Sequence, residues 1–256
     1  RLPPERARDC LVGLVEAATG RTADPSHDFE RWSRATFGDA VVDQFMAPYN
    51  HKVWGVAPAE LSATWIAERV SLVDWRSILG RVVTGTDDLA WGPNNRFSFP
   101  AAGGTGEIWR RAAAAFADRI RYGSAVVAVE PDRRVVTTAD GTEIPYDHLV
   151  STMALDRLVP LVAGAPTAVA EAAASLVHQT VAVVGLGYEA PVTDDRSWLY
   201  FADLDVPCYR ATNFAKYAPA NVPGADTARY SSWMCEVGWW AGGPLEGEAL
   251  VEAVDS

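Results

Sequence analysis

Apolar residues in the first third of the chain recur three and four positions apart, which is the spacing of one helix face. The stripe over residues 5–18 follows Pro3 and Pro4 and is closed by Gly20, as expected for the start and stop of a helix. Further helices are predicted over residues 29–37, 40–46, 61–70 and 73–83, with an irregular connection at Pro48-Tyr49-Asn50. Short helices in succession indicate a small helical bundle.

The pattern changes near Thr84, after which residues 95–99 alternate polar and aromatic as a strand would. A glycine-rich stretch at 101–106 then opens a helix that is expected to run to about Arg119. A β-meander is predicted next, with strands at 125–129, 135–138 and 142–144.

In the second half, the segment Leu149-Val150-Ser151-Thr152 predicts a buried strand. Two alanine-rich helices follow at 154–162 and 167–175. Extended segments are then predicted at 181–186, 197–201, 208–211 and 229–236. The fold class is therefore expected to be α+β.

Composition narrows the class of protein. The net charge of −11 argues against a nucleic-acid surface, which needs a basic face. No apolar stretch approaches the ~20 residues of a membrane span, and nothing resembles a secretory signal, so a cytoplasmic protein is expected. Three widely spaced cysteines indicate reduced thiols, and the four histidines have no metal-ligand spacing, so no metal site is expected.

Two glycine motifs could serve a cofactor. Residues 185–190 follow an apolar run, but Pro191 stands where a dinucleotide fingerprint needs a helix, so a glycine-tolerant strand is favoured. Residues 103–106 precede a predicted helix whose first amides could face a phosphate or an anionic ring. A plain turn explains these glycines equally well.

Arginines and aromatic residues provide the other candidates. Trp198 and Tyr200 alternate on one predicted strand and so share a face, while Arg210 and Tyr217 lie near another. Arg69 ends the predicted helix 61–70. Two arginines converging on one cleft would suit a diphosphate, and the aromatic residues would stack on a base or a sugar. Taken singly, each residue is more often a surface ion-pair partner or a core aromatic.

Eight segments, in order along the chain, resemble the eukaryotic-type UDP-galactopyranose mutases, which belong to the amine-oxidase-like flavoproteins. They are 45–54 (FMAPYNHKVW), 65–70 (WIAERV), 91–94 (WGPN), 97–100 (FSFP), 103–106 (GGTG), 149–153 (LVSTM), 198–201 (WLYF) and 209–212 (YRAT). The resemblance implies interconversion of UDP-galactopyranose and UDP-galactofuranose through a covalent adduct of reduced FAD. It also implies UDP-galactose as the small-molecule partner, while a homo-oligomer stays open.

The resemblance also implies roles for particular residues. The diphosphate clamp would comprise Arg69 and Arg210 as catalytic residues, with Tyr217 beside them. The remaining substrate-binding residues would be Phe45, Asn50, Trp54, Asn94, Trp198 and Tyr200. For the flavin, the implied contacts are Gly103, Gly104 and, beside the adenine, Val126.

By the same resemblance, residues 1–83 would form a helical substrate-side domain and 84–100 a strand of the substrate-side sheet. Residues 101–155 would belong to a FAD-binding domain and 156–256 to an antiparallel-sheet substrate domain. The family's Gly-x-Gly-x-x-Gly loop and its C-terminal flavin-covering segment match nothing in this chain, which begins at Arg1 and ends at Ser256. We therefore expect a central portion of the enzyme, unable by itself to hold FAD tightly or to catalyse the reaction.

Two alternatives stay open from the sequence. One is an amine-oxidase-like or protoporphyrinogen-oxidase-like oxidoreductase, which would not need paired diphosphate arginines. The other is a non-catalytic nucleotide-sugar binding module, which would bind UDP without a flavin.

Overall fold

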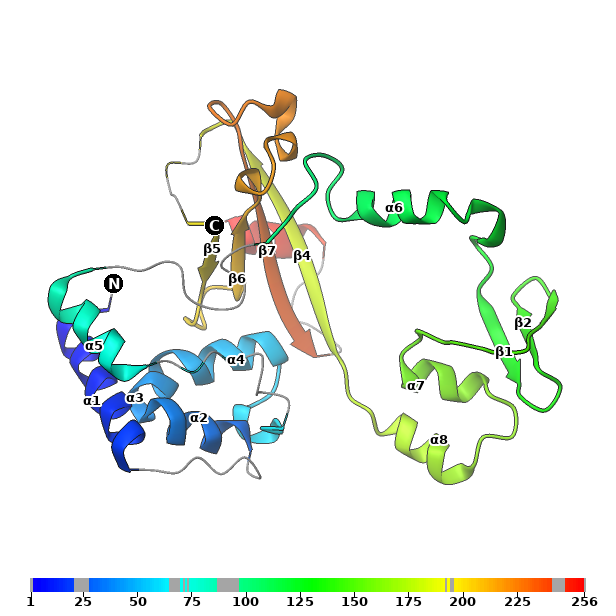
Figure 1. Ribbon diagram of the computed structural model, residues 1–256, viewed down its shortest axis with the longest axis horizontal. Coiled ribbons are helices and arrows are strands. Elements are labelled where there is room, and N and C mark those ends of the chain that lie inside the picture. Colours follow the sequence, from blue (N-terminus) through cyan, green and yellow to red (C-terminus); the bar gives the residue numbers. More distant parts are fainter. Residues whose placement is uncertain are drawn as a thin grey trace. The chain divides into compact units, whose positions relative to one another are not determined.

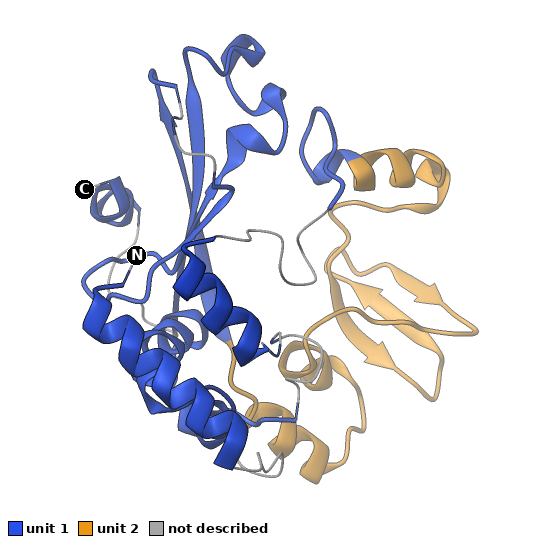
Figure 2. Cartoon of the chain, turned by 60° about the vertical axis from the view of Figure 1, so that its left-hand side comes forward, with its two compact units in different colours: residues 1–107, 179–256 blue, residues 108–178 orange. Residues whose placement is uncertain are grey.

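The fold is α+β, as the sequence pattern predicts (Figure 1). The computed structural model describes residues 2–20, 28–64, 70, 72, 74–86, 97–191, 193, 196–240 and 247–255. The chain divides into two compact units, residues 1–107 with 179–256 and residues 108–178, each of which is described by itself (Figure 2). The division reflects contacts within the chain and says nothing of ligand binding. The assignment of residues 101–155 to a FAD-binding domain therefore stays a prediction.

The first unit begins with the predicted helices. They are α1 (Pro4–Gly20), α2 (Phe29–Phe37), α3 (Asp39–Val41), α4 (Ala47–Trp54) and α5 (Trp75–Thr84), with a π-helical segment at Val42–Met46 and a 3₁₀ turn at Pro58–Glu60. The side chain of Asp28 caps α2 by accepting a hydrogen bond from the amide of Arg31 at 2.9 Å. Phe29 is almost fully buried and packs with Trp32, which places a small apolar core under α2.

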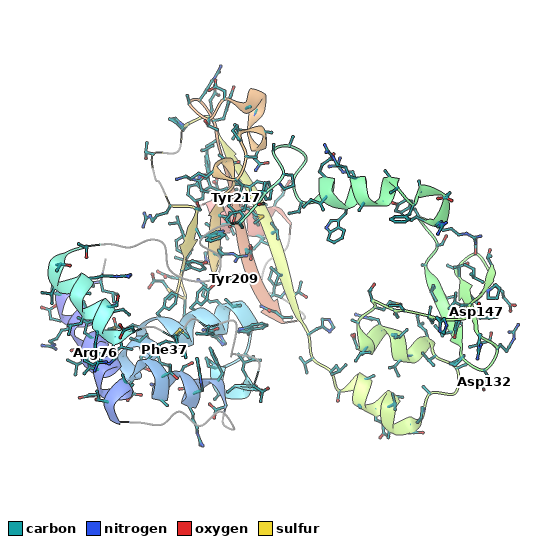
Figure 3. The ribbon with its side chains drawn as sticks, in the orientation of Figure 1. Phe37, Arg76, Asp132, Asp147, Tyr209 and Tyr217 are labelled. Carbon is teal, nitrogen blue, oxygen red and sulfur yellow. The ribbon has the colours of Figure 1, made fainter. Side chains whose placement is uncertain are left out.

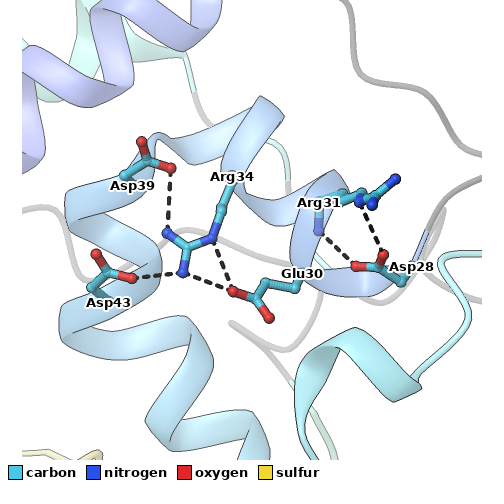
Figure 4. Close-up of polar contacts among 6 residues, drawn as sticks. All are labelled: Asp28, Glu30, Arg31, Arg34, Asp39 and Asp43. Carbon is cyan, nitrogen blue, oxygen red and sulfur yellow. Dashed lines mark hydrogen bonds and ion pairs between the residues drawn. The ribbon is translucent and has the colours of Figure 1, made fainter.

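Arg34 of α2 joins this helix to the two segments that follow it (Figure 4). Its guanidinium pairs with Glu30 at 2.7 Å, Asp39 at 3.3 Å and Asp43 at 2.7 Å. Three carboxylates around one cation hold α2, α3 and the π-helical segment together. This network is structural, because each partner belongs to the same helical region.

Two predictions for this region were wrong. Residues 48–50 are not irregular but lie in α4. The π-helical turn before them closes with the bond from the amide of Ala47 to the carbonyl of Val42, so the helix continues into α4. Pro48 then falls in the first turn, where a missing N–H is tolerated. The start of the predicted helix 61–70 is instead extended, since Leu61 accepts the amide of Phe29 at 2.8 Å. Residues 65–69 lie outside the described part.

The second half of the first unit is an antiparallel sheet in the order β4-β7-β6-β5. Its strands are β4 (Gln179–Tyr188), β5 (Trp198–Tyr200), β6 (Arg210–Asn213) and β7 (Ser231–Trp240), so the four predicted strands are confirmed with shifted ends. Gly185 and Gly187 lie inside β4, which confirms that they are strand glycines and not a dinucleotide turn.

Different helices pack against the two faces of this sheet. On one face, Val184, Cys235 and Val237 pack with Leu250 of α9 (Glu248–Asp255), and we call this the α9 face. On the other, α4 packs against β7 (Figure 1), and we call it the α4 face. The helix comes so near that a Cβ on Gly238 would lie 2.7 Å from the carbonyl oxygen of Lys52. Glycine at this position therefore lets α4 lie directly on the sheet.

The second unit carries the predicted meander, with β1 (Val126–Glu130), β2 (Val135–Thr138) and β3 (Glu143–Pro145). Helix α6 (Gly106–Ala114) leads into it, and short 3₁₀ turns lie at Ala117–Arg119 and Val159–Leu161. Helices α7 (Leu155–Leu158) and α8 (Thr167–Ala174) follow, in the two alanine-rich segments.

The sheet region of the first unit also contains three 3₁₀ turns, at Phe214–Lys216, Pro219–Asn221 and Pro223–Ala225.

Two predicted strands are absent from the described residues. Residues 149–152 form no strand, and Val150 is 89% exposed, because no strand among the described residues pairs with this segment. Residues 97–100 also form no strand. Their alternation has another cause, since Phe97 and Phe99 both place their rings against Tyr217. Residues 87–96 lie outside the described part.

The described helices include none that is long and apolar enough to cross a membrane. Among the same residues, no group of three or more His, Cys, Asp or Glu side chains is arranged to hold a metal ion.

The close approach of α4 to the sheet yields a stability prediction. Gly238→Ala should lower the free energy of unfolding by about 1–3 kcal/mol, because the added methyl group overlaps backbone oxygen atoms that cannot rotate away. Urea unfolding measures the change. Gly187→Ala in β4 is the matched control, since a Cβ there meets no atom within 4 Å. Equal stability losses in the two variants would contradict the tight helix–sheet contact.

Candidate functional site

The candidate site is centred on Arg210, the first residue of β6. In the sheet, Arg210 stands between Tyr200 of β5 and Glu236 of β7. The guanidinium donates from Nε to Oε1 of Glu236 at 3.1 Å and also from Nη2 to the same oxygen. The other carboxylate oxygen, Oε2, accepts the hydroxyl of Tyr209 at 2.6 Å. Both oxygens of Glu236 are therefore engaged, and Arg210 is held along one edge.

Burial makes this arrangement strong. The Glu236 side chain is 10% exposed and that of Arg210 is 34% exposed, so the carboxylate lies inside while part of the guanidinium faces outward. Desolvation is the largest single influence on Arg210 and disfavours its charge, but the hydrogen bonds to Glu236 together with the Coulombic attraction of Glu236 and the neighbouring tyrosines raise the pKa of the guanidinium. Arg210 is thus a fixed cation, and among the described residues no hydrogen bond engages the donor groups on its outer edge.

One group of aromatic rings lies on the α4 side of this pair. Tyr49 of α4 stacks on Phe45 with ring centroids 5.1 Å apart and meets Tyr200 and Tyr209 edge-on at 5.6 and 6.3 Å. Desolvation is the main cause that raises the pKa of both Tyr49 and Tyr209 above the ordinary phenol value. These phenols stay neutral across the physiological range and can act only as hydrogen-bond partners and apolar surface.

A second group of rings surrounds Tyr217, which Figure 3 shows with Tyr209 at the four-stranded sheet. The ring of Tyr217 lies 4.8 Å from Phe97, 5.1 Å from Phe99 and 5.5 Å from Phe214 by centroid. Trp198 stacks on Phe97 at 5.4 Å and meets Tyr217 edge-on at 6.2 Å. Tyr217 is thereby fixed from several sides.

Arg210 connects the two ring groups electrostatically. Its positive charge acts to lower the pKa of Tyr49 in the first group and of Tyr217 in the second, although burial outweighs it at both. The site thus combines a fixed guanidinium, neutral phenol hydroxyls and flat aromatic surfaces. Such a set is suited to an anionic group attached to a ring.

The structure brings together five of the residues singled out from the sequence: Phe45, Trp198, Tyr200, Arg210 and Tyr217. Asn50 is buried, and its side-chain amide donates to the carbonyl of Met46 at 2.7 Å, a bond within its own helical segment. Trp54 ends α4 and is 37% exposed. Arg69 and Asn94 lie outside the described residues, so their roles stay predictions.

The expected flavin contacts fall in different places. Gly103 and Gly104 lie in the turn before α6, separated from it by Thr105, and have positive φ angles of 79° and 63°. Val126 begins β1 and belongs to the other compact unit, where it pairs with Thr138. Their roles toward a flavin stay predictions.

Sequence reasoning missed Glu236, Tyr209, Tyr49 and Phe97 as members of this site. Glu236 carried a usable signal, because an acidic residue that directly follows the apolar residues of a predicted strand needs a cationic partner if it is buried. The pairing with Arg210, 26 positions away, depends on the strand register and could not be read from spacing. Tyr49 was assigned to an irregular segment, which hid its place on a helix face.

The chain belongs to the family of flavin-containing amine oxidoreductases, whose pattern it matches over residues 14–239. Among solved structures it is similar to a reduced UDP-galactopyranose mutase, with a TM-score of 0.90 and 32% identity over 100% of this chain and 55% of that one. The resemblance noted from the eight sequence segments is thereby confirmed.

Two more distant structures share the fold alone. A candidate protoporphyrinogen oxidase from Exiguobacterium sp. 255-15 gives a TM-score of 0.70 at 15% identity, covering 99% of this chain and 55% of that one. A CLA-producing fatty acid isomerase from P. acnes gives 0.57 at 12% identity, covering 98% and 58%. The chain spans about half the length of the solved structures it matches.

The buried pair predicts an unequal effect of two similar substitutions. Glu236→Gln should lower the free energy of unfolding by about 1–3 kcal/mol, because it leaves a half-buried guanidinium without its charged acceptor. Glu189→Gln is the matched control, since the Glu189–Arg229 pair is 65% and 61% exposed and should matter by less than about 1 kcal/mol. Denaturant unfolding of both variants measures the two free-energy changes. Similar small losses would show that the Arg210–Glu236 pair is not held as described.

The raised pKa of Tyr209 predicts a pH dependence. A phenol with a raised folded-state pKa contributes stability below its unfolded pKa of about 10, and that stability is lost as pH rises further. The stability advantage of the wild type over Tyr209→Phe should therefore shrink between about pH 9 and pH 11. Unfolding free energies across that range measure it. A constant difference would contradict the buried bond to Glu236.

Proposed function

We propose that this chain supplies the diphosphate and sugar site of a flavin-dependent mutase that interconverts UDP-galactopyranose and UDP-galactofuranose. The single observation that supports this most directly is Arg210, fixed by Glu236 and Tyr209 and flanked by two groups of aromatic rings. A solved structure to which the chain is 32% identical is that of a UDP-galactopyranose mutase. The proposed activity is that of an isomerase.

In this proposal Arg210 binds the diphosphate of the substrate. Glu236 occupies one edge of the guanidinium, so the donors of the other edge are left to meet phosphate oxygens in a fixed direction. When the bond between the sugar and UDP breaks, negative charge develops on the departing diphosphate. A positioned cation stabilises that charge more than it stabilises the bound substrate, which accelerates the step. Arg69 is proposed as the second arm of the clamp.

The aromatic groups would shape the site and exclude water from it. Tyr217, fixed by Phe97, Phe99 and Phe214, can donate its hydroxyl to the same diphosphate. Trp198 and Tyr200 offer ring faces for the uracil or the sugar, and Phe45 extends that surface through Tyr49. Asn50, Trp54 and Asn94 are proposed as further lining residues. Exclusion of water by these rings strengthens every interaction with the diphosphate.

The residues present are compatible with a flavin. Gly103 and Gly104 leave the turn before α6 without side chains, and a Cβ on Gly104 would meet no atom within 4 Å, so the backbone there is open to a planar ligand. We propose these glycines and Val126 as contacts for FAD. In its reduced form the flavin would supply the nucleophile that the anomeric carbon of the sugar requires.

The test of the proposed function is product formation by the full-length natural protein reduced with dithionite. UDP-galactofuranose should form from UDP-galactopyranose, and reoxidised protein should form none. Oxidation of an amine or of a protoporphyrinogen, without a mutase product, would place the protein with the oxidoreductases that share its fold. UDP binding without any turnover would favour a non-catalytic module.

Substitution of Arg210 gives a sharper prediction. Arg210→Lys keeps the charge but loses the planar fork, so kcat/KM should fall about 100-fold, with much of the loss in kcat. Arg229→Lys is the control, because Arg229 forms an exposed pair with Glu189 and should leave kcat/KM within about twofold of the wild type. Steady-state assays of both variants measure the difference. An unchanged kcat in Arg210→Lys would contradict the proposed stabilisation of the departing diphosphate.

A further inference from the structure

Two positions in β4 carry glycine although neither backbone conformation nor packing within the described chain requires it. Gly185 and Gly187 lie inside a ten-residue strand, where glycine weakens a sheet because it has no side chain to pack and loses more backbone freedom on folding. Neither has a positive φ angle, and a Cβ on either would meet no atom of the described residues within 4 Å. Gly238 of β7 differs, because its missing side chain admits α4.

The strand register places the two β4 glycines on the α4 face of the sheet. Val184 belongs to the apolar cluster on the α9 face, so residues 183, 185 and 187 point to the other face. There Val183 lies opposite Glu236, the partner of Arg210. The two glycines follow it along the strand, and both are exposed. They form an open surface without side chains on the face that carries the candidate site, and we call this pair the glycine floor.

Two hydroxyl groups beside the glycine floor lack a partner. Ser232 of β7 lies opposite Gly187 in the register. Thr212 of β6 lies opposite Met234, which is the β7 partner of Gly185. Both hydroxyl oxygens are buried without a hydrogen-bond partner among the described residues, and Thr212 is only 1% exposed. Because buried hydroxyls are nearly always hydrogen-bonded, these two point to a polar ligand on this face of the sheet.

Arg210 stands between two unlike surfaces on the α4 face. On the β5 side of it, Trp198 and Tyr200 offer aromatic rings. On the other side, across β7, lies the glycine floor with Ser232 at its border. Ring faces suit a nucleobase, whereas a surface without side chains beside a hydroxyl suits a saturated ring that carries hydroxyls of its own. Adjacent strands are about 4.8 Å apart, so β4 lies about 10 Å from β6, within reach of a sugar joined to a phosphate that Arg210 binds.

We propose that the glycine floor is the subsite for the hexose of a nucleotide sugar. The sugar ring lies against the bare backbone of β4, and the hydroxyl of Ser232 bonds to a hydroxyl of that ring. A side chain at position 185 or 187 would occupy the space of the sugar and leave the diphosphate at Arg210 undisturbed. This inference rests on the proposed function, because it places the sugar relative to the diphosphate.

Titrations of UDP and UDP-galactose into the oxidised full-length natural protein test the floor, because the two ligands differ only in the sugar. In Gly187→Val, affinity for UDP should stay within about twofold of the wild type, while affinity for UDP-galactose should fall at least about tenfold. Gly187→Ala, the smaller change, should shift the ratio of the two affinities in the same direction. Thr180→Ile is the matched control, because it enlarges an exposed side chain on the α9 face of the same strand and should change neither affinity.

Ser232→Ala tests the hydroxyl. It removes a group without a partner in the described chain, so the unfolding midpoint should not change, while affinity for UDP-galactose alone should fall about two- to tenfold.

Three outcomes would overturn the inference. Equal losses for UDP and UDP-galactose in Gly187→Val, or no loss for either, would exclude the sugar subsite and leave the proposed function standing. Loss of bound FAD from Gly187→Val, with both nucleotide affinities unchanged, would place the cofactor on the floor in place of the sugar. If the wild type binds neither nucleotide, the proposed function fails and the sugar subsite fails with it.

Discussion

The burial of the Arg210 guanidinium against the Glu236 carboxylate is the interaction on which the rest of the site depends. A carboxylate with a side chain that is 10% exposed is tolerated only when its oxygens are satisfied, and here Arg210 and Tyr209 satisfy both. The result is a cation that cannot swing freely. Its direction is fixed by the strand register that places β6 beside β7.

That register also explains why the two faces of the sheet can serve different purposes. Side chains alternate along β7, so Cys235 and Val237 enter the apolar cluster under α9 while Glu236 turns toward α4. Helix α4 can lie close to the strand because Gly238 has no side chain to hold it away. Its Tyr49 then reaches both Tyr200 and Tyr209. The apolar cluster and the candidate site thus lie on opposite faces of one sheet.

Much of this could be predicted from local patterns. The helices at 4–20 and 29–37 and the strands β4 and β7 follow from the pattern of apolar residues, because that pattern lies within each segment. The wrong predictions concern segments whose structure depends on contacts with residues far away in the sequence. Residues 149–152 read as a buried strand by composition alone, and the π-helical turn that admits Pro48 into α4 has no signature in residue spacing. Glu236 was missed for the same reason, since its partner is set by register.

The central claim is that the outer edge of Arg210 binds a diphosphate. Calorimetric titration of UDP and UMP into the full-length natural protein tests it most directly, because the two ligands differ only in the second phosphate. The account predicts that UDP binds at least about tenfold more tightly than UMP, the amount expected of charge-assisted hydrogen bonds to one phosphate. Equal affinities for the two nucleotides would contradict it.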